Sequence, residues 1–231
     1  MILGLDTTTT FLHLALVDGD RAWTRRVPVG AARSQSAALL PSLNELMDEA
    51  GSTPRELTGV VACVGPGGFT SLRIGVATAE GLALTGLPTW GFSAFELRAK
   101  ALHLAGLHEP LWVLLDGQRS EVFAQYWTEG PKGLACKHPL ETLPQLLKGR
   151  PWWAPGEFTG KVVPFAGLAP VLLEDEGAAM LGGLVALCRK LPQRPPEVPL
   201  VPFYLRETDA EINFPEASRH LSDALRQGHA R

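Results

Sequence analysis

The chain has no lysine before Lys100, and its 24 acidic residues outnumber its 21 lysines and arginines. The formal net charge of −3 provides no global basic field that would attract nucleic acid. Tight binding of RNA by this chain alone is therefore not expected. The missing lysines also exclude the Gly-Lys-Ser/Thr ending of a P-loop from the first part of the chain.

Cysteines are few, and long apolar runs are absent. Cys63, Cys136 and Cys188 make an odd number with no CxxC spacing, which is typical of reduced thiols in a cytosolic protein. Asp6 interrupts the first apolar run, so no signal peptide is predicted. No run approaches the length of a membrane span. We expect a cytoplasmic protein with no membrane contact.

Metal-binding and nucleophile motifs are also missing. The six histidines form neither HxxxH nor HExxH. His103 and His108 are five residues apart, which places them off a common helical face for chelation. The segment 91–95 lacks the closing glycine of a nucleophile elbow. These observations predict no metal site and no catalytic residue.

Apolar strands and amphipathic helices alternate along the first half of the chain. We expect a strand that ends at Asp6, a hairpin that turns at Asp18-Gly19, and a helix that Ser34 or Ser36 caps. Further strands are predicted over 57–64 and 87–93, and further helices over 70–84 and 93–106. The order β-β-β-α-β-α-β-α indicates a mixed sheet with helices packed on it.

A second unit begins near Pro110. Two strands are expected around a loop at Asp116-Gly117, and a helix over 174–191 has acidic residues at its start and basic residues at its end. A final amphipathic helix is predicted over 214–227. The proline- and tryptophan-rich segment between these elements has no pattern that assigns it.

A glycine-rich turn leads directly into a predicted helix. Its residues of interest are Gly65, Pro66, Gly67, Gly68, Thr70 and, one turn into the helix, Gly75. Thr70 stands where a GxGxxG pattern has its last glycine, so the turn is not a dinucleotide fingerprint. Backbone amides at the helix start could bind an anion. The alternative, which we favour, is a turn shaped for packing.

The helix after that turn has almost no polar face. Arg73 and Glu80 are its only charged residues, and the others are mostly apolar or small. A helix that is apolar nearly all round must be buried nearly all round, and small residues allow a second helix to approach closely. The helix is therefore buried within its own domain, or one of its sides meets a second subunit.

Asp6 is followed at once by Thr7 and Thr8. A carboxylate at a strand end followed by hydroxyls is how actin-like and sugar-kinase-like folds begin their first phosphate loop, where the aspartate holds hydrated Mg²⁺. Aspartate and threonine also form ordinary turns, so both interpretations stay open.

Five segments resemble the TsaB (YeaZ-type) family of tRNA threonylcarbamoyladenosine biosynthesis proteins. They are "ILGLDTTT", "LLPSLNELM", "VGPGGFTSLRIGVATAEGLAL", "LLDGQRSEVFAQYW" and "PFYLR". The match runs through most of the chain in the right order and is poor over roughly 130–200. One departure is Gln35-Ser36-Ala37, where the family commonly has His-Ser-Glu.

The resemblance implies an α/β fold of the actin/hexokinase/Hsp70 (ASKHA) type, with two lobes of mixed β-sheets flanked by helices. The N-terminal lobe is expected over 1–107, with helix 214–227 as a candidate to complete it. The C-terminal lobe is expected over 108–213.

The resemblance also implies a non-catalytic scaffold and activator. Its partner is a TsaD-type paralogue, which works with a TsaE-type ATPase to transfer a threonylcarbamoyl group to N6 of adenosine 37 in tRNA. Catalysis is expected on the TsaD-type protein, and tRNA contact with this chain only indirectly. We expect a homodimer when the chain is alone, no cofactor or metal of its own, and ATP with Mg²⁺ only weakly or at the complex interface. The alternative is an independent sugar-kinase-like phosphotransferase that uses Asp6 with Mg-ATP.

Helices 34–50 and 70–84 are predicted to form one continuous apolar face for the homodimer or the TsaD-type partner. The expected interface residues are Leu39, Leu43, Leu46, Met47, Phe69, Leu72, Arg73, Val76, Ala79 and Ala83. Replacing Val76 or Ala79 with aspartate is expected to abolish association and leave a folded monomer.

Overall fold

The first half of the chain forms a five-stranded mixed sheet. The computed structural model describes residues 1–30, 34–191 and 199–205. The strands are β1 (Ile2–Asp6), β2 (Phe11–Asp18), β3 (Arg21–Pro28), β4 (Gly59–Gly65) and β5 (Thr89–Ser93), in the order β3-β2-β1-β4-β5. β1, β4 and β5 are parallel, whereas β2 pairs antiparallel with both β1 and β3. The predicted hairpin and mixed sheet are confirmed.

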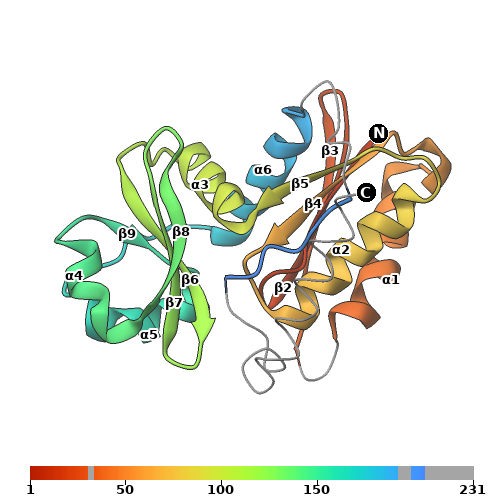
Figure 1. The fold of residues 1–231 in the computed structure, drawn as a ribbon. Helices are drawn as coiled ribbons and strands as arrows, with labels where there is room; N and C mark the ends of the chain where they lie inside the picture. The colour runs from red at the N-terminus through yellow and green to blue at the C-terminus, as the bar shows by residue number, and fades with distance from the viewer. Residues whose placement is uncertain (31–33, 192–198, 206–231) are drawn as a thin grey trace, which may run out of the picture.

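Helices cover both faces of this sheet (Figure 1). α1 (Gln35–Ala50) and α2 (Phe69–Ala83) pack on one face, with the short 3-10 turn η1 (Pro54–Glu56) following α1. α3 (Ala94–Leu104) and α6 (Glu176–Arg189) pack on the other face. The predicted cap of α1 is confirmed, because the Ser34 hydroxyl accepts a hydrogen bond from the Ala37 amide.

A second, four-stranded sheet follows in the order β8-β7-β6-β9. Its strands are β6 (Leu111–Gln118), β7 (Glu121–Trp127), β8 (Pro131–Pro139) and β9 (Trp152–Trp153). The turn η2 (Leu140–Thr142) and the helices α4 (Leu143–Leu147) and α5 (Gly156–Ala166) pack on its outer face. The predicted α/β fold of two lobes with mixed sheets and flanking helices is confirmed.

The position of α6 differs from the expected organisation. Its sequence lies in the predicted C-terminal lobe, whereas its contacts lie with the first sheet. A Cβ atom on Gly4 of β1 would lie 2.5 Å from the Cys188 sulfur and 3.1 Å from Leu184, so α6 lies directly against β1. A Cβ atom on Gly183 would lie 3.1 Å from the Ala101 amide nitrogen of α3. Small residues therefore allow the sheet and both helices to approach closely. The predicted helix 214–227 lies outside the described residues.

The turn between β6 and β7 also differs from expectation. β6 continues past the predicted loop at Asp116-Gly117, and the chain reverses at Gln118, Arg119 and Ser120, whose φ angles are 60°, 46° and 62°. The Asp116 carboxylate accepts a 2.7 Å hydrogen bond from the Gln118 amide and so stabilises the turn from within the strand.

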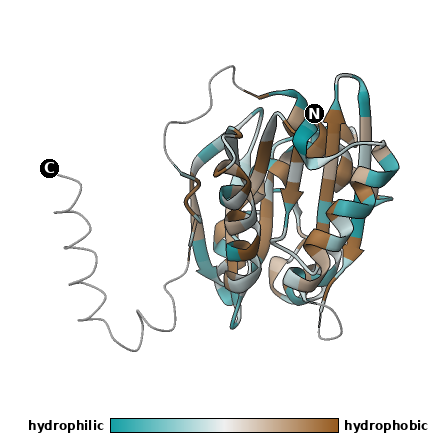
Figure 2. Ribbon diagram, turned by 90° about the vertical axis from the view of Figure 1, so that its right-hand side faces the viewer, coloured by the Kyte–Doolittle hydropathy of each residue, from teal (hydrophilic) through white to brown (hydrophobic). Residues whose placement is uncertain are grey.

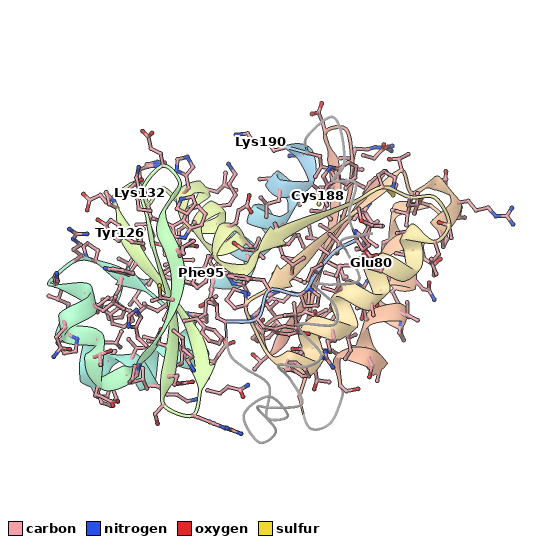
Figure 3. All side chains as sticks on the ribbon, viewed as in Figure 1. Glu80, Phe95, Tyr126, Lys132, Cys188 and Lys190 are labelled. Carbon is pink, nitrogen blue, oxygen red and sulfur yellow. The ribbon has the colours of Figure 1, made fainter. Side chains whose placement is uncertain are left out.

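One apolar core joins the two sheets. It contains residues of β4, β5, α3 and α6 together with residues of β6 and Trp153 of β9. Phe95 of α3 is fully buried and lies between the two lobes (Figure 3). Figure 2 shows hydrophobic residues gathered on the strands and on the helix faces that turn towards them. The cleft described next is therefore framed by two lobes that share a core.

Candidate functional site

Asp6, the last residue of β1, lies at the centre of a buried polar cluster. Its Oδ1 atom accepts hydrogen bonds from the Thr8 amide at 2.9 Å and from the Thr8 hydroxyl at 2.6 Å. Its Oδ2 atom lies 3.0 Å from Nη2 of Arg98, which α3 brings from the next layer. His13 Nδ1, from β2, lies 3.7 Å from the same oxygen. Asp6 and Arg98 are both essentially inaccessible to solvent.

This arrangement keeps the carboxylate ionised. Burial by itself raises the pKa of Asp6, but the Arg98 guanidinium, with His13 and Thr8, outweighs burial and holds that pKa well below its usual range. A buried charge of this kind is tolerated because it is paired and hydrogen-bonded.

The Asp6 cluster does not suit a hydrated Mg²⁺ ion. A cation at this carboxylate would have to displace the Arg98 guanidinium from a solvent-free position. Within the described residues there is also no group of three or more His, Cys, Asp or Glu side chains that could hold a metal. The Asp-Thr-Thr segment thus has the sequence of a phosphate loop, while an internal arginine occupies the position beside its carboxylate.

Arg98 is the functional residue that sequence reasoning missed. In the predicted helix over 93–106 it occupies the apolar stripe formed by Phe95 and Leu102, at spacings of three and four residues. An arginine on a buried stripe needs a carboxylate partner, and Asp6 at a strand end is the available one. That signal was present in the sequence, but the partner is 92 residues away and only the fold identifies it.

Thr7 and Gln35 hold the same loop against the helices instead of facing outward. The Thr7 hydroxyl donates a 2.7 Å hydrogen bond to the Ser71 carbonyl in the first turn of α2. The buried Gln35 side chain donates to the carbonyls of Thr7 and Thr9 at 3.1 and 3.0 Å. Gln35 stands where the resembling family commonly has histidine, and here it fastens the start of α1 to the loop after β1.

The glycine-rich turn lies beside this loop and is closely packed. A Cβ atom on Gly67 would lie 2.6 Å from Thr8 Cβ, and one on Gly75 would lie 2.4 Å from Thr7 Oγ1. Gly65 has a φ of +109°, which disfavours any residue with a side chain, and a Cβ there would lie 2.7 Å from the Phe203 carbonyl oxygen. These contacts explain the glycines by packing, whereas Gly68 and Thr70 are partly or fully exposed at the start of α2.

A cleft of about 260 Å³ opens between the lobes where these loops meet. The first lobe contributes Thr8, Thr9, Thr10, Pro66, Gly67, Gly68, Ser71 and Arg98, and the second contributes Leu115, Asp116, Gln118, Pro155, Glu157 and Phe158. The structure therefore brings the predicted phosphate loop and the predicted glycine turn to one cleft. Thr10 hydrogen-bonds Glu157 at 3.1 Å across it.

The expected interface residues divide into two groups. Seven of them are buried in the chain's own core between the first sheet and helices α1 and α2: Leu39, Leu43, Leu46, Met47, Leu72, Val76 and Ala79. Their assignment to a partner surface is corrected, because their helical stripe is the one that packs on β1, β2 and β4. Ala83 is partly buried, and Phe69 and Arg73 are exposed.

Phe69 and Arg73 form a cluster with the end of the described chain. The Arg73 guanidinium lies 3.8 Å from the centre of the Phe69 ring, and its Nε donates a 2.9 Å hydrogen bond to the Tyr204 hydroxyl. The Phe203 amide donates to the Val64 carbonyl at 2.6 Å, so this segment docks beside β4. Sequence reasoning grouped Tyr204 with the late "PFYLR" segment and gave no indication that it contacts α2.

An outer helical face remains on α1 and α2 after the buried stripe is removed. We use this name for the exposed residues Leu40, Phe69, Arg73, Ala77, Gly81 and Leu84. Leu84 is 89% exposed and Leu40 is 58% exposed.

His103 and His108 lie closer together than the sequence spacing predicted. Their Nδ1 atoms are 3.0 Å apart, because His108 follows the end of α3 and turns back towards it. Both rings are on the surface, and two exposed ligands alone do not make a metal centre.

The chain is similar in sequence to proteins of tRNA modification. A model of the family described as TsaD, tRNA N6-adenosine threonylcarbamoyltransferase, matches residues 25–132. The Bacillus subtilis tRNA threonylcarbamoyladenosine biosynthesis protein TsaB is 30% identical over 124 residues, which are 53% of this chain and 52% of that protein. The chain spans about half the length of the curated TsaB relatives that it matches.

Two solved structures from Pseudomonas aeruginosa match over more of the chain. One is an uncharacterized protein described as similar to peptidase YEAZ, with a TM-score of 0.68 and 26% identity over 89% of this chain and 99% of that one. The other is YeaZ, with a TM-score of 0.66 and 25% identity over 80% of this chain and 90% of that one.

The two mixed sheets with flanking helices make this an α/β protein whose fold is similar to that of the two YeaZ structures. Within that class, the chain is similar to the TsaB relatives and to the TsaD family model. In the described part of the chain, none of the helices has the length and apolarity that a membrane crossing requires.

Proposed function

We propose that this chain is a non-catalytic scaffold and activator in tRNA threonylcarbamoyladenosine biosynthesis. In this proposal it binds and stabilises a TsaD-type partner, which carries out transfer to N6 of adenosine 37 in tRNA with the help of a TsaE-type ATPase. When alone it forms a homodimer, and it works in the cytoplasm. The printed function of the TsaB relatives supports this role.

One observation carries the non-catalytic part of the proposal. The carboxylate that would hold Mg²⁺ in a kinase of this fold is fully buried and paired with Arg98 at 3.0 Å. Breaking that pair would leave an uncompensated buried charge on one side or the other, which costs about 3–5 kcal/mol. The site is therefore stabilised in a form that opposes metal binding, and we propose that the chain holds no cofactor of its own.

The outer helical face is the surface that we propose for the partner. The α2 helix exposes Arg73, Ala77, Gly81 and Leu84 at spacings of four, four and three residues, so these side chains form one stripe. Its central members are small, which allows another helix to approach closely. Exposed apolar side chains at its end provide area that water contacts unfavourably.

Leu84 and Leu134 provide a matched test of this surface. Both leucines are almost fully exposed, at 89% and 88%, but Leu84 follows α2 and Leu134 lies on β8 of the other lobe. We expect Leu84→Asp, alone or with Ala77→Asp, to weaken homodimer and partner association at least tenfold, because an interface would bury the new charge. Leu134→Asp should leave association unchanged. Analytical ultracentrifugation and titration with a TsaD-type protein measure both effects.

Equal association of the Leu84→Asp variant and the wild-type protein would overturn the proposed surface. The Val76 and Ala79 substitutions do not make this test, because both side chains lie in the chain's own core and an aspartate there unfolds the protein. The functional readout is threonylcarbamoyladenosine formed on tRNA by the partner and the ATPase. The amount of modified adenosine should depend on the presence of this chain and should be lower with the Leu84→Asp variant.

The independent phosphotransferase is the second candidate, and the cleft between the lobes is the observation in its favour. It is lined by three threonines and by Asp116 from the opposite lobe. Isothermal calorimetry with ATP and Mg²⁺ separates the two functions. Micromolar binding by the lone chain would support the phosphotransferase; weak binding or none is expected for the scaffold.

A further inference from the structure

A hollow of about 460 Å³ lies on the outer side of the second lobe, away from the cleft and from α2. Its lining comes from the second sheet and from the region around α4. The residues are Trp112 of β6, His138 of β8, Thr142 just before α4, Gln145 and Leu146 within α4, and Lys148 and Arg150 after it. α4 has only five residues, so it covers just part of this face of the sheet. The hollow is the part left uncovered.

Aromatic rings and cations are combined at this hollow and beside it: Trp112 and Arg150 line the hollow, and Tyr126 and Lys132 lie next to it. The Trp112 and Tyr126 rings are 5.2 Å apart at their centres and inclined by 50°. The Arg150 guanidinium lies 4.8 Å from the centre of the Tyr126 ring, a cation–π distance. Lys132 is directly opposite Tyr126 in the β7–β8 register, so it stands on the same face of the sheet. Figure 3 places Tyr126 and Lys132 on this lobe.

The charged side chains that line the hollow, Lys148 and Arg150, have the same sign. Among its described lining residues are Lys148, Arg150 and His138, and none is a carboxylate. The Trp112 indole N–H is buried and has no hydrogen-bond partner among the described residues. A buried donor without an acceptor is costly. Cations without a carboxylate beside them suit an anionic ligand.

From this geometry we propose that the hollow binds a segment of single-stranded RNA. A base stacks on the Tyr126–Trp112 rings, and the phosphates on either side of it meet Lys148 and Arg150. The identity of the RNA rests on the proposed function, in which tRNA is the substrate of the complex. Because the chain carries a net charge of −3, this contact is weak for the lone chain and adds to contacts made by the partner.

Direct binding to the full chain tests the proposal without any partner. The probes are a fluorescent single-stranded RNA of about twelve nucleotides and an unmodified tRNA, each measured by anisotropy at low salt. Lys148→Glu with Arg150→Glu should lower the affinity for both at least tenfold, because two phosphate contacts become repulsive. Lys190→Glu, which reverses a single positive charge at the end of α6 (Figure 3), should change affinity less than twofold.

The proposed stacking of a base on the aromatic rings is tested by two variants of Tyr126. Tyr126→Phe keeps the ring and should bind RNA as the wild-type chain does, whereas Tyr126→Leu should lower the affinity about fivefold or more. Far-ultraviolet circular dichroism and the thermal midpoint of each variant confirm that the sheet is intact. The salt dependence of binding should become shallower in the double charge variant, since fewer counterions are released.

Three results would overturn the proposal. They are unchanged RNA affinity in the Lys148 and Arg150 double variant, an equal loss in Lys190→Glu, and competition by adenosine monophosphate or inorganic phosphate as effective as competition by the oligonucleotide. Failure of the scaffold proposal is seen separately, because partner association depends on the outer helical face. The double variant should bind a TsaD-type partner normally even where it loses RNA.

Discussion

At the scale of single residues, the Asp6–Arg98 pair is the clearest departure from the chemistry that the local sequence suggests. Asp6 and the threonines after it have the residue types of a phosphate loop, yet Oδ1 of the carboxylate accepts hydrogen bonds from Thr8 and Oδ2 is ion-paired with Arg98. Buried ion pairs of this kind contribute little net stability, but the loss of one partner is severe because the remaining charge stays buried. The pair therefore links the end of β1 to α3.

Arg98→Ala should lower the free energy of unfolding by about 3–5 kcal/mol, since Asp6 is left ionised and unpaired in a site without water. The double variant Asp6→Asn with Arg98→Met should recover most of this loss, because no buried charge remains. Urea denaturation followed by circular dichroism measures both. A loss below about 1 kcal/mol in the single variant would mean that water reaches the carboxylate.

Acid stability should depend on the same carboxylate. The folded-state pKa of Asp6 lies below its unfolded value of about 3.9, so the stability that it contributes is complete above that pH and is lost as the pH falls below it. The wild-type chain should lose about 1.4 kcal/mol per pH unit more than the Asp6→Asn/Arg98→Met variant below about pH 4. Urea midpoints between pH 2.5 and 6 measure the difference. Parallel curves for the two proteins would contradict it.

At the scale of elements, α2 is a helix with two apolar sides. Its buried stripe of Leu72, Gly75, Val76 and Ala79 packs on the first sheet, and its other side is exposed or covered by the segment around Tyr204. The apolar composition of α2 predicted that the helix is buried, but it did not indicate which of its two sides packs on the sheet. The contact of Gly75 with Thr7 identifies the inner side, because no side chain can be accommodated there without movement.

Gly75 and Gly81 make a matched pair within this helix. Gly75→Ala should destabilise the protein by about 1–3 kcal/mol, because its Cβ would lie 2.4 Å from the Thr7 hydroxyl oxygen. Gly81→Ala should stabilise it by about 0.5–1 kcal/mol, because a Cβ there meets nothing within 4 Å and alanine favours the helix. Thermal denaturation of the two variants and of the wild-type protein measures both changes in stability. A similar change of the same sign in both variants would show that helix propensity outweighs packing.

At the scale of the whole molecule, α3 and α6 lie between the two sheets and share one apolar core with both. Leu184 of α6 and Phe95 of α3 belong to the same buried cluster as Val113 of β6 and Trp153 of β9. Two lobes that share a core of this kind are not independent folding units. Packing in the shared core therefore holds the two lobes in position on either side of the cleft.

Leu184→Ala should lower the midpoint temperature of one thermal transition in which both lobes unfold together. It should not shift only one of two separate transitions. The substitution leaves a cavity that costs about 2–5 kcal/mol in a core that both sheets line. Tryptophan fluorescence, to which Trp153 contributes from the second lobe, and far-ultraviolet circular dichroism should give coincident curves. Separate transitions, with only one shifted by the substitution, would show that the lobes unfold independently.

Much of the local structure could be predicted from the sequence. Strand alternation and the cap at Ser34 depend on a few neighbouring residues, and the structure has these elements where they were expected. β8, β9, α4 and α5 were not predicted, because prolines and tryptophans there obscure periodicity. The expected interface list failed for a related reason: helical periodicity finds the apolar stripe of α1 and α2 but does not say whether the chain's own sheet covers it.

By itself, the sequence determined the kinds of element and the family that the chain resembles. Those properties depend on backbone conformation and residue type within a few positions. Only the tertiary structure decided that Arg98 neutralises Asp6, that α6 returns to the first sheet, and that Tyr204 reaches Arg73. Each of these joins residues that are distant along the chain, and their partners are chosen by which faces pack together.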